Sequence, residues 1–399
     1  MSDGPWLTIV GLGEDGPDGL SPASRRALDG ADVIMGPPRH LGLLHDARAE
    51  RIAWPAPFAD GLAILLGLRG RRTVVLASGD PFLFGAGAAI ARVLDPSEWR
   101  ALPAPSTFSL AAARLGWPLE RTLCLGLHAA PISRLRPHLT PGLRAIVLLR
   151  DGAAVAGLGG YLAAQGFGES LLTVLEALGG PAERITAARA DALPPTAFAH
   201  PVAAALTVAG DGAAVPRASG VDDGFFENDG QISKRPVRAL ALSALAPRPG
   251  EFLWDIGGGS GSIAIEWLLS HPEAEAACIE ARPDRADRIR ANAERLGVDR
   301  LRVVEGEAPG ALDGLPAPQA VFLGGGMNET LLVELRKRVA SGTRLVAHAV
   351  TLDSEALLAE QSARLGGELL RIELAEAAPL GSRRGWKAAY PVVQWRVTL

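Results

Sequence analysis

The sequence predicts an α/β protein of two domains, and three observations support this. Short apolar runs alternate with Ala-, Leu- and Arg-rich helical stretches, an alternation typical of largely parallel sheets. Residues 209–230 interrupt it with a stretch that has no hydrophobic period and is rich in Gly, Asp, Pro and Ser. The length of 399 residues exceeds what one ordinary core supports. We therefore expect two domains of different design on either side of this stretch.

In the N-terminal half, apolar β-rich runs predict strands at 6–10, 31–35, 73–77, 122–126, 145–149, 171–178 and 202–209. A helix over 109–116 ends at Gly116 and is closed off by Pro118, so we divide this half into lobes of about 1–118 and 119–210. The linker is expected at 211–222.

In the C-terminal half, 223–399, the same patterns predict helices near 235–246, 260–270 and 283–297 and strands at 251–256, 275–280, 301–305 and 319–323. Residues 386–399 are expected to form a strand pair or one long terminal strand. The alternation predicts a Rossmann-like, doubly wound domain.

The composition narrows the classes of function. The formal net charge of -4 argues against nucleic acid, which normally requires a basic face. The longest charge-free run, 192–210, contains three prolines, so no membrane span is expected. The first residues lack the pattern of a signal peptide, which predicts a cytoplasmic location. Cys124 and Cys278 are too few for a disulfide framework or a zinc site, and no metal is expected.

The segment LWDIGGGSGSIAIEW, residues 253–267, places glycines between a predicted strand and a predicted helix. Asp255 ends the strand, and a tight turn from Gly257 to Gly261 precedes a helix opened by Ser260 or Ser262. The G-x-G-x-G spacing differs from the G-x-G-x-x-G of dinucleotide sites. It suits a smaller ligand whose amino-acid or nucleoside part lies against bare backbone.

Two further strand ends fit the same ligand. Glu280 closes an apolar strand 19 residues beyond Gly261, where a carboxylate can accept both hydroxyls of a ribose. Glu307 and Ala308 follow the next strand, where they could border an adenine. Together these features favour an S-adenosylmethionine-dependent methyltransferase of the Rossmann type. The alternative for Glu280 is a solvated acid at a helix start.

Polar residues also follow strands in the N-terminal half. Gly79 and Asp80 come directly after the strand at 73–77, and Ser106 and Thr107 stand at a helix N-terminus, where hydroxyls and amides can receive a carboxylate. A turn and an N-cap explain each feature alone. Their occurrence in one domain favours a second binding site.

Four segments of the N-terminal half resemble the tetrapyrrole methylases of the cobalamin pathway: VGLGEDGPDGLSP, ADVIMGPPRHLGLL, ASGDPFLFGAG and PSTFSLAAARLGWP. The C-terminal half resembles the Rossmann-type methyltransferases that partner them, through FFENDGQISKRPVRALALSALAP, LWDIGGGSGSIAIEW and AVTLDSEALL. The resemblance implies a two-lobed tetrapyrrole methylase domain at 1–210, followed by the Rossmann-like domain.

The two halves in this order are similar to fused methyltransferases that act on a precorrin between precorrin-6B and precorrin-8X. The resemblance implies methylation at C-5 by the N-terminal domain, and methylation at C-15 with decarboxylation of the ring C acetate by the C-terminal domain. S-adenosylmethionine would be the donor, with one site per domain, and a homo-oligomer is implied by analogy. Electron-rich carbons of the macrocycle attack the sulfonium methyl, so the protein needs no nucleophile of its own.

The resemblance also implies site residues. The C-terminal cofactor site would comprise Ser233, Gly257, Gly258, Gly259, Ser260, Gly261, Glu280 and Ala308. The N-terminal cofactor site would comprise Gly79, Asp80, Phe82, Ser106 and Thr107. Candidate contacts to substrate carboxylates are Arg39, His128, Arg235 and Arg238. Candidates for proton transfer and decarboxylation are Asp229, Lys234 and His348.

The sequence departs from the family pattern at three of these places. Ser233 stands where the family usually shows Thr, and His348 where it shows Asn. His128 is kept, but alanines replace the Gly and Arg that usually follow it. Two other functions remain open: a methylase fused to a nicotinamide-dependent dehydrogenase, as in siroheme synthesis, and a non-catalytic tetrapyrrole carrier. The first would require a G-x-G-x-x-G motif near a terminus, and the second has no use for cofactor loops.

Overall fold

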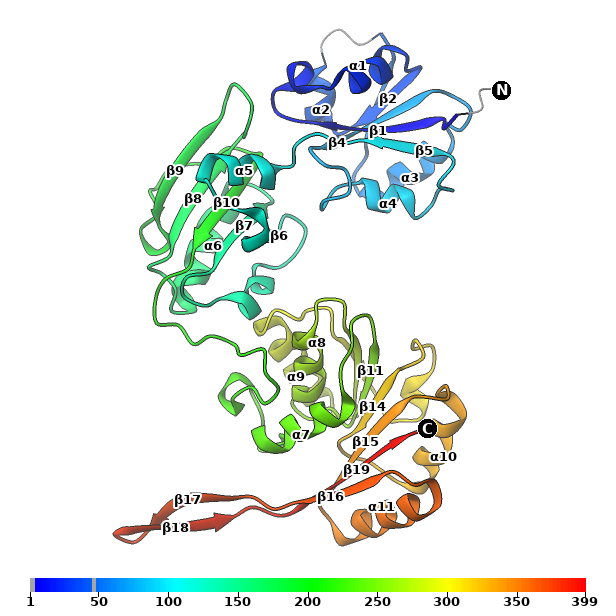
Figure 1. Cartoon of the computed structure of the whole chain (residues 1–399), viewed down its shortest axis with the longest axis vertical. Coiled ribbons are helices and arrows are strands. Elements are labelled where there is room, and N and C mark those ends of the chain that lie inside the picture. The colour runs from blue at the N-terminus through cyan, green and yellow to red at the C-terminus, as the bar shows by residue number, and fades with distance from the viewer. Residues whose placement is uncertain (1–3, 45–47) are drawn as a thin grey trace. The chain divides into compact units, whose positions relative to one another are not determined.

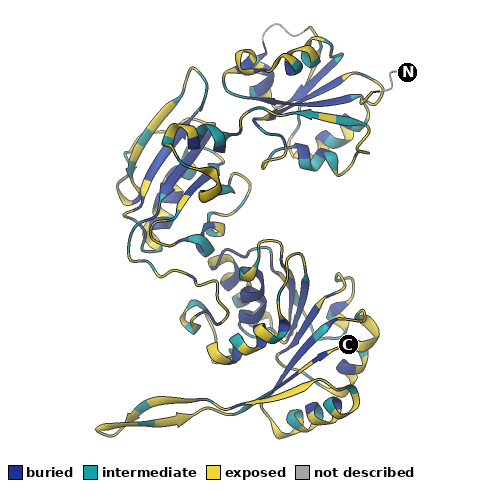
Figure 2. Cartoon of the chain, in the orientation of Figure 1, coloured by how far each residue is buried: buried dark blue, intermediate teal, exposed yellow. Residues whose placement is uncertain are grey.

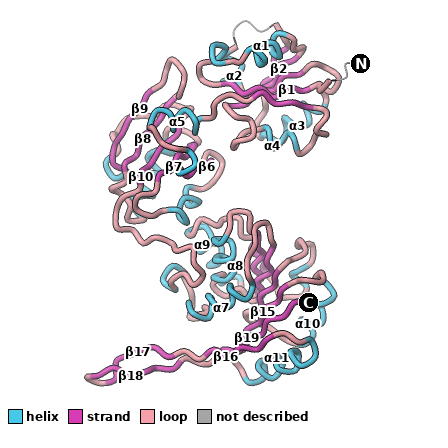
Figure 3. Tube along the Cα trace, viewed as in Figure 1, coloured by secondary structure: helices cyan, strands magenta, loops and turns pink. Residues whose placement is uncertain are grey.

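The computed structural model describes residues 4–44 and 48–399, which form two compact units (Figure 1). Unit 1 comprises the residues up to Ala130 together with Thr140–Ala213, and unit 2 comprises Pro131–Leu139 and Ala214–Leu399. Helices and strands alternate along most of both units, with loops between them (Figure 3). Buried residues concentrate on the central strands of the three larger sheets (Figure 2).

Unit 1 begins with a parallel five-stranded sheet in the order β3-β2-β4-β1-β5. Its elements are β1 (Leu7–Leu12), α1 (Pro22–Asp29), β2 (Val33–Gly36), α2 (Pro38–Leu43), β3 (Glu50–Ala53), α3 (Phe58–Leu66), β4 (Thr73–Ser78), α4 (Gly87–Ala91) and β5 (Trp99–Leu102). Along β1, Leu7 and Ile9 enter one apolar core while Val10 and Leu12 enter another. Both faces of the sheet are therefore covered, as parallel sheets require.

The second sheet of unit 1 has the order β6-β7-β10-β8-β9 and is mostly antiparallel. Its elements are α5 (Thr107–Leu115), β6 (Leu123–Gly126), β7 (Arg144–Leu149), α6 (Ala153–Ala164), β8 (Leu171–Glu176), β9 (Arg184–Arg189) and β10 (Val202–Thr207). The expectation of largely parallel sheets is wrong here, because only β6 and β7 run parallel. Phe108 and Ala111 of α5 pack in one core with Ile146 and Leu175. The lobe boundary therefore precedes α5, rather than lying at 118.

Unit 2 contains a seven-stranded sheet in the order β13-β12-β11-β14-β15-β19-β16. Its elements are α7 (Arg235–Leu245), β11 (Phe252–Ile256), α8 (Ser262–Ser270), β12 (Glu275–Glu280), α9 (Pro283–Arg295), β13 (Arg302–Glu305), β14 (Ala320–Leu323), α10 (Glu329–Arg338), β15 (Arg344–Ala349), α11 (Leu352–Leu365), β16 (Glu368–Ile372) and β19 (Val392–Thr398). The strands from β13 to β15 run parallel, and β19 is antiparallel to its neighbours. The strand order reverses between β11 and β14, which is the switch point where ligands bind in such sheets.

The C-terminal tail differs from both expected forms. Strands β18 (Arg383–Ala388) and β19 both lie in it, but they do not pair with each other. Strand β18 pairs with β17 (Ala375–Leu380) in a two-stranded arm that projects from unit 2 (Figure 1). Most of this arm is exposed (Figure 2).

Two segments that the sequence pattern assigned to the N-terminal domain or to the linker lie in unit 2. The 3-10 helix η3 (Ile132–His138) comes from the middle of the methylase half, yet Arg134 forms a two-bonded ion pair with Asp299 at 2.7 and 2.9 Å. Val221, expected in the linker, is buried in the unit 2 core. The backbone amides of Gly220 and Val221 both donate to the Glu266 carboxylate. The second half of the expected linker, residues 211–222, is therefore held against unit 2.

Among the residues described, no helix is both long and apolar enough to cross a membrane.

Candidate cofactor and substrate sites

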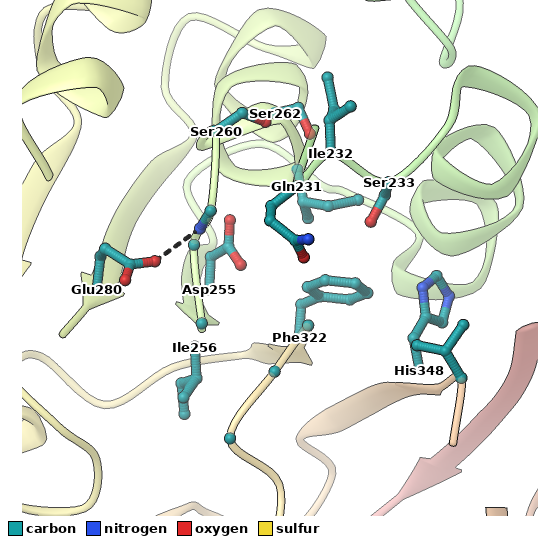
Figure 4. A pocket seen from close by; sticks show the side chains of 18 of the residues that line it. Gln231, Ile232, Ser233, Asp255, Ile256, Ser260, Ser262, Glu280, Phe322 and His348 are labelled. Carbon is teal, nitrogen blue, oxygen red and sulfur yellow. Dashed lines mark hydrogen bonds between the residues drawn. The ribbon is translucent and has the colours of Figure 1, made fainter. Parts of the chain in front are cut away.

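A pocket of about 830 Å³ lies where the parallel strands of unit 2 end. Of the predicted residues, Ser233, Lys234, Gly257, Gly258, Gly259, Ser260, Glu280, Ala308 and His348 line it. Figure 4 shows Glu280 and His348 on opposite sides of the view, with Asp255 and Phe322 between them. The pocket thus spans the sheet from the β12 end to the β15 end, as the switch-point rule predicts.

The glycine loop has a backbone that other residues rarely adopt. Gly257, Gly259 and Gly261 have φ angles of +78°, +60° and +75°. Helix α8 begins at Ser262, one of the two serines expected to open it, and Gly261 is its N-cap. A side chain on Gly258 would meet Cys278 Sγ at 2.3 Å. Packing and conformation therefore fix part of this loop, and the bare backbone that results faces the pocket.

Glu280 is not the solvated acid of the alternative interpretation, because only 6% of it is exposed. Its Oε2 accepts the Gly259 amide at 2.8 Å (Figure 4), and its Oε1 accepts the Arg282 amide at 3.0 Å. A carboxylate oxygen has capacity for a second donor. Both oxygens are thus oriented by backbone, and each can still accept a ligand hydroxyl.

Asp255 also lines this pocket, although its position at a strand end predicted no role in the site. It is buried at the end of β11, where its Oδ2 accepts the Ala264 amide at 3.0 Å and lies 3.7 Å from Cys278 Sγ. Burial raises the pKa of Asp255 to about 7. The carboxyl therefore changes charge near neutral pH, beside the glycine loop.

His348 stands at the far side of the pocket, on β15. Its Nε2 lies 2.9 Å from Gln394 Oε1, and its ring meets Phe322 edge-on at 5.0 Å between centroids. Burial lowers the pKa of His348, so the ring is neutral at pH 7. With the Nε2 proton donated to the amide oxygen, Nδ1 carries the free lone pair.

Four predicted residues of unit 2 do not line the pocket: Gly261, Asp229, Arg235 and Arg238. Asp229 binds Arg285 at 2.9 Å and Arg288 at 3.2 Å, and the hydrogen bond from Arg285 strongly lowers the pKa of this carboxyl. A carboxylate held in this way is a weak proton acceptor, which argues against the predicted catalytic role.

Arg238 was expected at the mouth of a cleft, but the structure contradicts this. The side chain is fully buried, and its Nε donates to Glu266 at 2.5 Å. Its other nitrogens bind Asp223 and the Val221 carbonyl. Arg238 therefore fixes the start of unit 2 instead of facing a ligand. Arg235 is exposed and lies 3.9 Å from Asp222.

Unit 1 contains a second pocket, of about 520 Å³. It is lined by Gly79, Asp80, Ser106, Thr107, Arg39 and His128 of the predicted set, whereas Phe82 is exposed and packs on Trp99 instead. Ser106 caps α5 by accepting the Ser109 amide at 3.1 Å. A side chain on Gly79 would meet the Pro105 carbonyl at 2.8 Å, so backbone packing also requires this glycine.

Arg39 organises the polar side of this pocket. Its guanidinium forms an ion pair with Glu14 and donates to Ser78 at 3.1 Å, and it lies 2.8 Å from His40 Nε2. Burial and the charge of Arg39 lower the pKa of His40 to about 3. Burial also lowers the pKa of His128. The pocket therefore contains an arginine, already paired with Glu14, beside neutral imidazoles, and a substrate carboxylate would have to share that arginine with Glu14.

Sequence reasoning missed several pocket residues in unit 2. Gln231 lies in the segment FFENDGQISKRPVRALALSALAP, two residues before Ser233, but was not singled out there. Tyr390 comes from a segment without a motif, so no pattern identified it. Gly324, Gly325 and Gly326 follow β14 directly, and a glycine run after a predicted strand was a usable signal. Within the described residues, no group of three or more His, Cys, Asp or Glu side chains could hold a metal ion.

Comparisons with known proteins match both halves. The family described as "Tetrapyrrole (Corrin/Porphyrin) Methylases" matches residues 6–194, and the "Precorrin methyltransferase domain" matches residues 224–399. A "Precorrin-6Y C(5,15)-methyltransferase [decarboxylating]" of a Sinorhizobium species is 51% identical over 399 residues, covering 99% of this chain and 96% of the relative. The chain belongs to the precorrin-6Y C5,15-methyltransferase family.

Two further relatives support membership of the precorrin-6Y C5,15-methyltransferase family. A protein of the same name from Mycobacterium tuberculosis is 42% identical over 401 residues, covering 98% of this chain and 99% of the relative. A "Cobalt-precorrin-6B C(15)-methyltransferase (decarboxylating)" of Salmonella typhimurium is 30% identical over 166 residues, covering 40% of this chain and 85% of that protein.

For a precorrin-6Y C5,15-methyltransferase, S-adenosylmethionine is the cofactor that the family implies. The unit 2 pocket fits this group, because a side chain on Gly257 or Gly259 would be strained and the loop between them is bare backbone. Glu280 adds two oriented carboxylate oxygens at the next strand end.

Proposed function

We propose that this chain methylates a precorrin at C-5 and C-15 and removes carbon dioxide from the ring C acetate, with one S-adenosylmethionine site in each unit. The observation that carries the proposal is the 51% identity, across nearly the whole of both chains, to a decarboxylating C5,15-methyltransferase. Two separate pockets, each lined by residues of a predicted cofactor site, support one site per unit.

In unit 2, the glycine loop and Glu280 would hold the cofactor, which supplies an electrophilic methyl group when bound. The protein then aligns donor and acceptor and excludes water, which accounts for much of the rate of such a transfer. Ser233 and Lys234 lie at the pocket wall before α7. Ser233 would contact the cofactor, and Lys234 is a candidate for proton transfer or decarboxylation. Neutral His348 is our candidate for the group that takes the proton released when the acceptor carbon gains its methyl.

In unit 1, Arg39 and His128 would bind carboxylates of the macrocycle, while Gly79, Asp80, Ser106 and Thr107 border the cofactor. We assign methylation at C-5 to this unit. We assign methylation at C-15 and decarboxylation to unit 2. The Salmonella relative supports this division, because a protein matched over only 40% of this chain carries the C(15) and decarboxylating activities in its name.

Product mass and cofactor stoichiometry test this proposal. The full chain, incubated with precorrin-6B and S-adenosylmethionine, should yield a product that has gained two methyl groups and lost one carbon dioxide. Titration with S-adenosylhomocysteine should give two sites per chain. One site, or a product with a single methyl, would contradict the proposal of two cofactor sites.

We further propose that the chain assembles as a homo-oligomer through the β17–β18 arm. A two-stranded hairpin is marginally stable alone in water, and Leu380 and Trp386 on this arm are 71% and 79% exposed. A second copy would cover them. Light scattering should show an oligomer for the native chain and a smaller species for Trp386→Glu. A monomeric native chain would contradict the proposal.

Besides a second copy of the chain, the partner that we propose is the polycarboxylate precorrin substrate. We propose no nucleic acid or membrane partner. Both cysteines are free thiols, which supports a cytoplasmic location.

A further inference from the structure

The loop after β14 contains three successive glycines, Gly324, Gly325 and Gly326, and all three line the unit 2 pocket. A glycine has a structural reason when its φ is positive or when a Cβ would collide with a neighbour. Gly326 has the first reason, with φ of +67°. Gly324 has the second, because its Cβ would lie 3.1 Å from the Gly257 carbonyl oxygen.

Gly325 has neither reason. Its φ is not in the left-handed region, and a Cβ built on it has no atom within 4 Å. Every other described glycine of this pocket has a positive φ or a close neighbour. They are Gly230, Gly257, Gly258, Gly259, Gly306, Gly324 and Gly326. The fold therefore tolerates a side chain at 325, and what it would fill is open space at the pocket.

The position of Gly325 within the pocket indicates what uses this space. Its backbone packs against Gly257, whose Cβ would meet the Gly325 amide nitrogen at 2.7 Å. The residues proposed for the donor side, up to Ala308, stand at the ends of β11, β12 and β13. His348 and Tyr390 lie on the other side, from β15 onward. Strand β14, and with it Gly325, lies between the two groups, as Figure 4 shows for Phe322.

We propose that Gly325 is a specificity-determining position that keeps the acceptor side of the pocket open, so that the flat face of the macrocycle reaches the donor methyl. This rests on the proposed function. Methyl transfer requires the reacting atoms to approach within about 3–3.5 Å, so a side chain between them separates donor from acceptor. A substituent at 325 will hinder the bulky acceptor while leaving the cofactor cradle intact.

The test compares Gly325→Ala and Gly325→Leu with Gly310→Leu in the full chain. Gly310 is a matched control, because it has an ordinary φ and no atom within 4 Å of its Cβ, and it lies outside the pocket. Gly259 is a poorer site for such a test, because its φ of +60° strains any substitution.

For Gly325→Leu we expect methyl transfer at C-15 to fall on the order of 100-fold. The C-15 rate of Gly325→Ala should fall less, and the C-15 rate of Gly310→Leu should equal that of the native chain. Thermal unfolding midpoints should stay within about 2 °C of native, and affinity for S-adenosylhomocysteine within about threefold.

Two outcomes would overturn the inference: a full C-15 rate in Gly325→Leu, or a loss of S-adenosylhomocysteine binding as large as the loss of rate. Failure of the proposed function would look different, because then the native chain and Gly310→Leu would also leave precorrin-6B unmethylated.

Discussion

The amide of Gly259 donates a 2.8 Å hydrogen bond to the carboxylate of Glu280, 21 residues further along the chain. This bond joins the loop after β11 to the end of β12, so the two parts of the proposed cofactor site hold each other in place. The carboxylate is buried and oriented before any ligand arrives. Preorganisation of this kind lowers the entropy that binding must offset.

Glu280→Ala should weaken binding of S-adenosylhomocysteine at the unit 2 site by about 2–4 kcal/mol, because charge-assisted hydrogen bonds are lost. Glu305→Ala is the matched control. Glu305 pairs in register with Glu280 on the adjacent strand, but it is exposed and binds Arg290. Calorimetric titration of both variants measures the difference. Equal affinities would mean that Glu280 has no cofactor role.

Asp255 should make the stability of unit 2 depend on pH. Burial raises its folded-state pKa to about 7, above the ordinary value of 3.8, so the folded state favours the protonated form. The contribution to stability is full below pH 3.8 and is lost as pH rises to about 7. Relative to Asp255→Asn, the native chain without cofactor should gain roughly 2–3 kcal/mol between pH 8 and pH 5. Denaturant unfolding of both chains at the two pH values checks this, and parallel pH profiles would rule it out.

Arg238→Ala should lower the free energy of unfolding by about 3–5 kcal/mol, because it leaves the Glu266 carboxylate buried without its cation. Arg235→Ala, three residues earlier on the same helix and exposed, should change it by less than about 0.5 kcal/mol. Urea unfolding of the two variants compares the sites. An unchanged free energy of unfolding in Arg238→Ala would show that the Arg238–Glu266 ion pair does not stabilise the fold.

Arg39→Ala should lower C-5 methylation on the order of 10- to 100-fold, because the unit 1 pocket loses its cation and Glu14 loses its partner. Methylation at C-15 on a substrate already methylated at C-5 should be unchanged. Arg72→Ala is the control, since Arg72 is exposed, pairs with Asp32 and lies outside the pocket. Mass spectrometry of the products separates the outcomes. If Arg39→Ala retains full C-5 activity, the substrate role of this arginine is wrong.

The fragment 214–399 should be less stable than unit 2 in the full chain, because it lacks residues 131–139. Leu135 and Leu139 of that segment are 0% and 1% exposed, and each fully buried Leu contributes about 1.5–3 kcal/mol. The fragment should therefore unfold at lower urea concentration, and fusing residues 131–139 to its N-terminus should restore part of the loss. Equal midpoints for the fragment and the fusion would show that the segment does not stabilise unit 2.

The sequence by itself determined the local features of this protein. The alternation of apolar runs correctly predicted the strands that flank the glycine loop in the sequence. This was possible because the hydrophobic periods of strands and helices are visible within short segments. The same locality explains why Gly257, Glu280 and Ala308 could be placed at successive strand ends. Parallel strands bring their carboxyl ends to one edge, so three distant motifs become one pocket without further information.

Only the tertiary structure decided which polar residues line a pocket. Arg235 and Arg238 look alike in sequence, but one is exposed and the other is buried against Glu266, because burial depends on what packs over a helix face. The same reason explains why residues 131–139 joined unit 2 and why Tyr390 reached the pocket. Contacts between segments far apart in the chain leave no periodic signal, so the sequence pattern contained no trace of them.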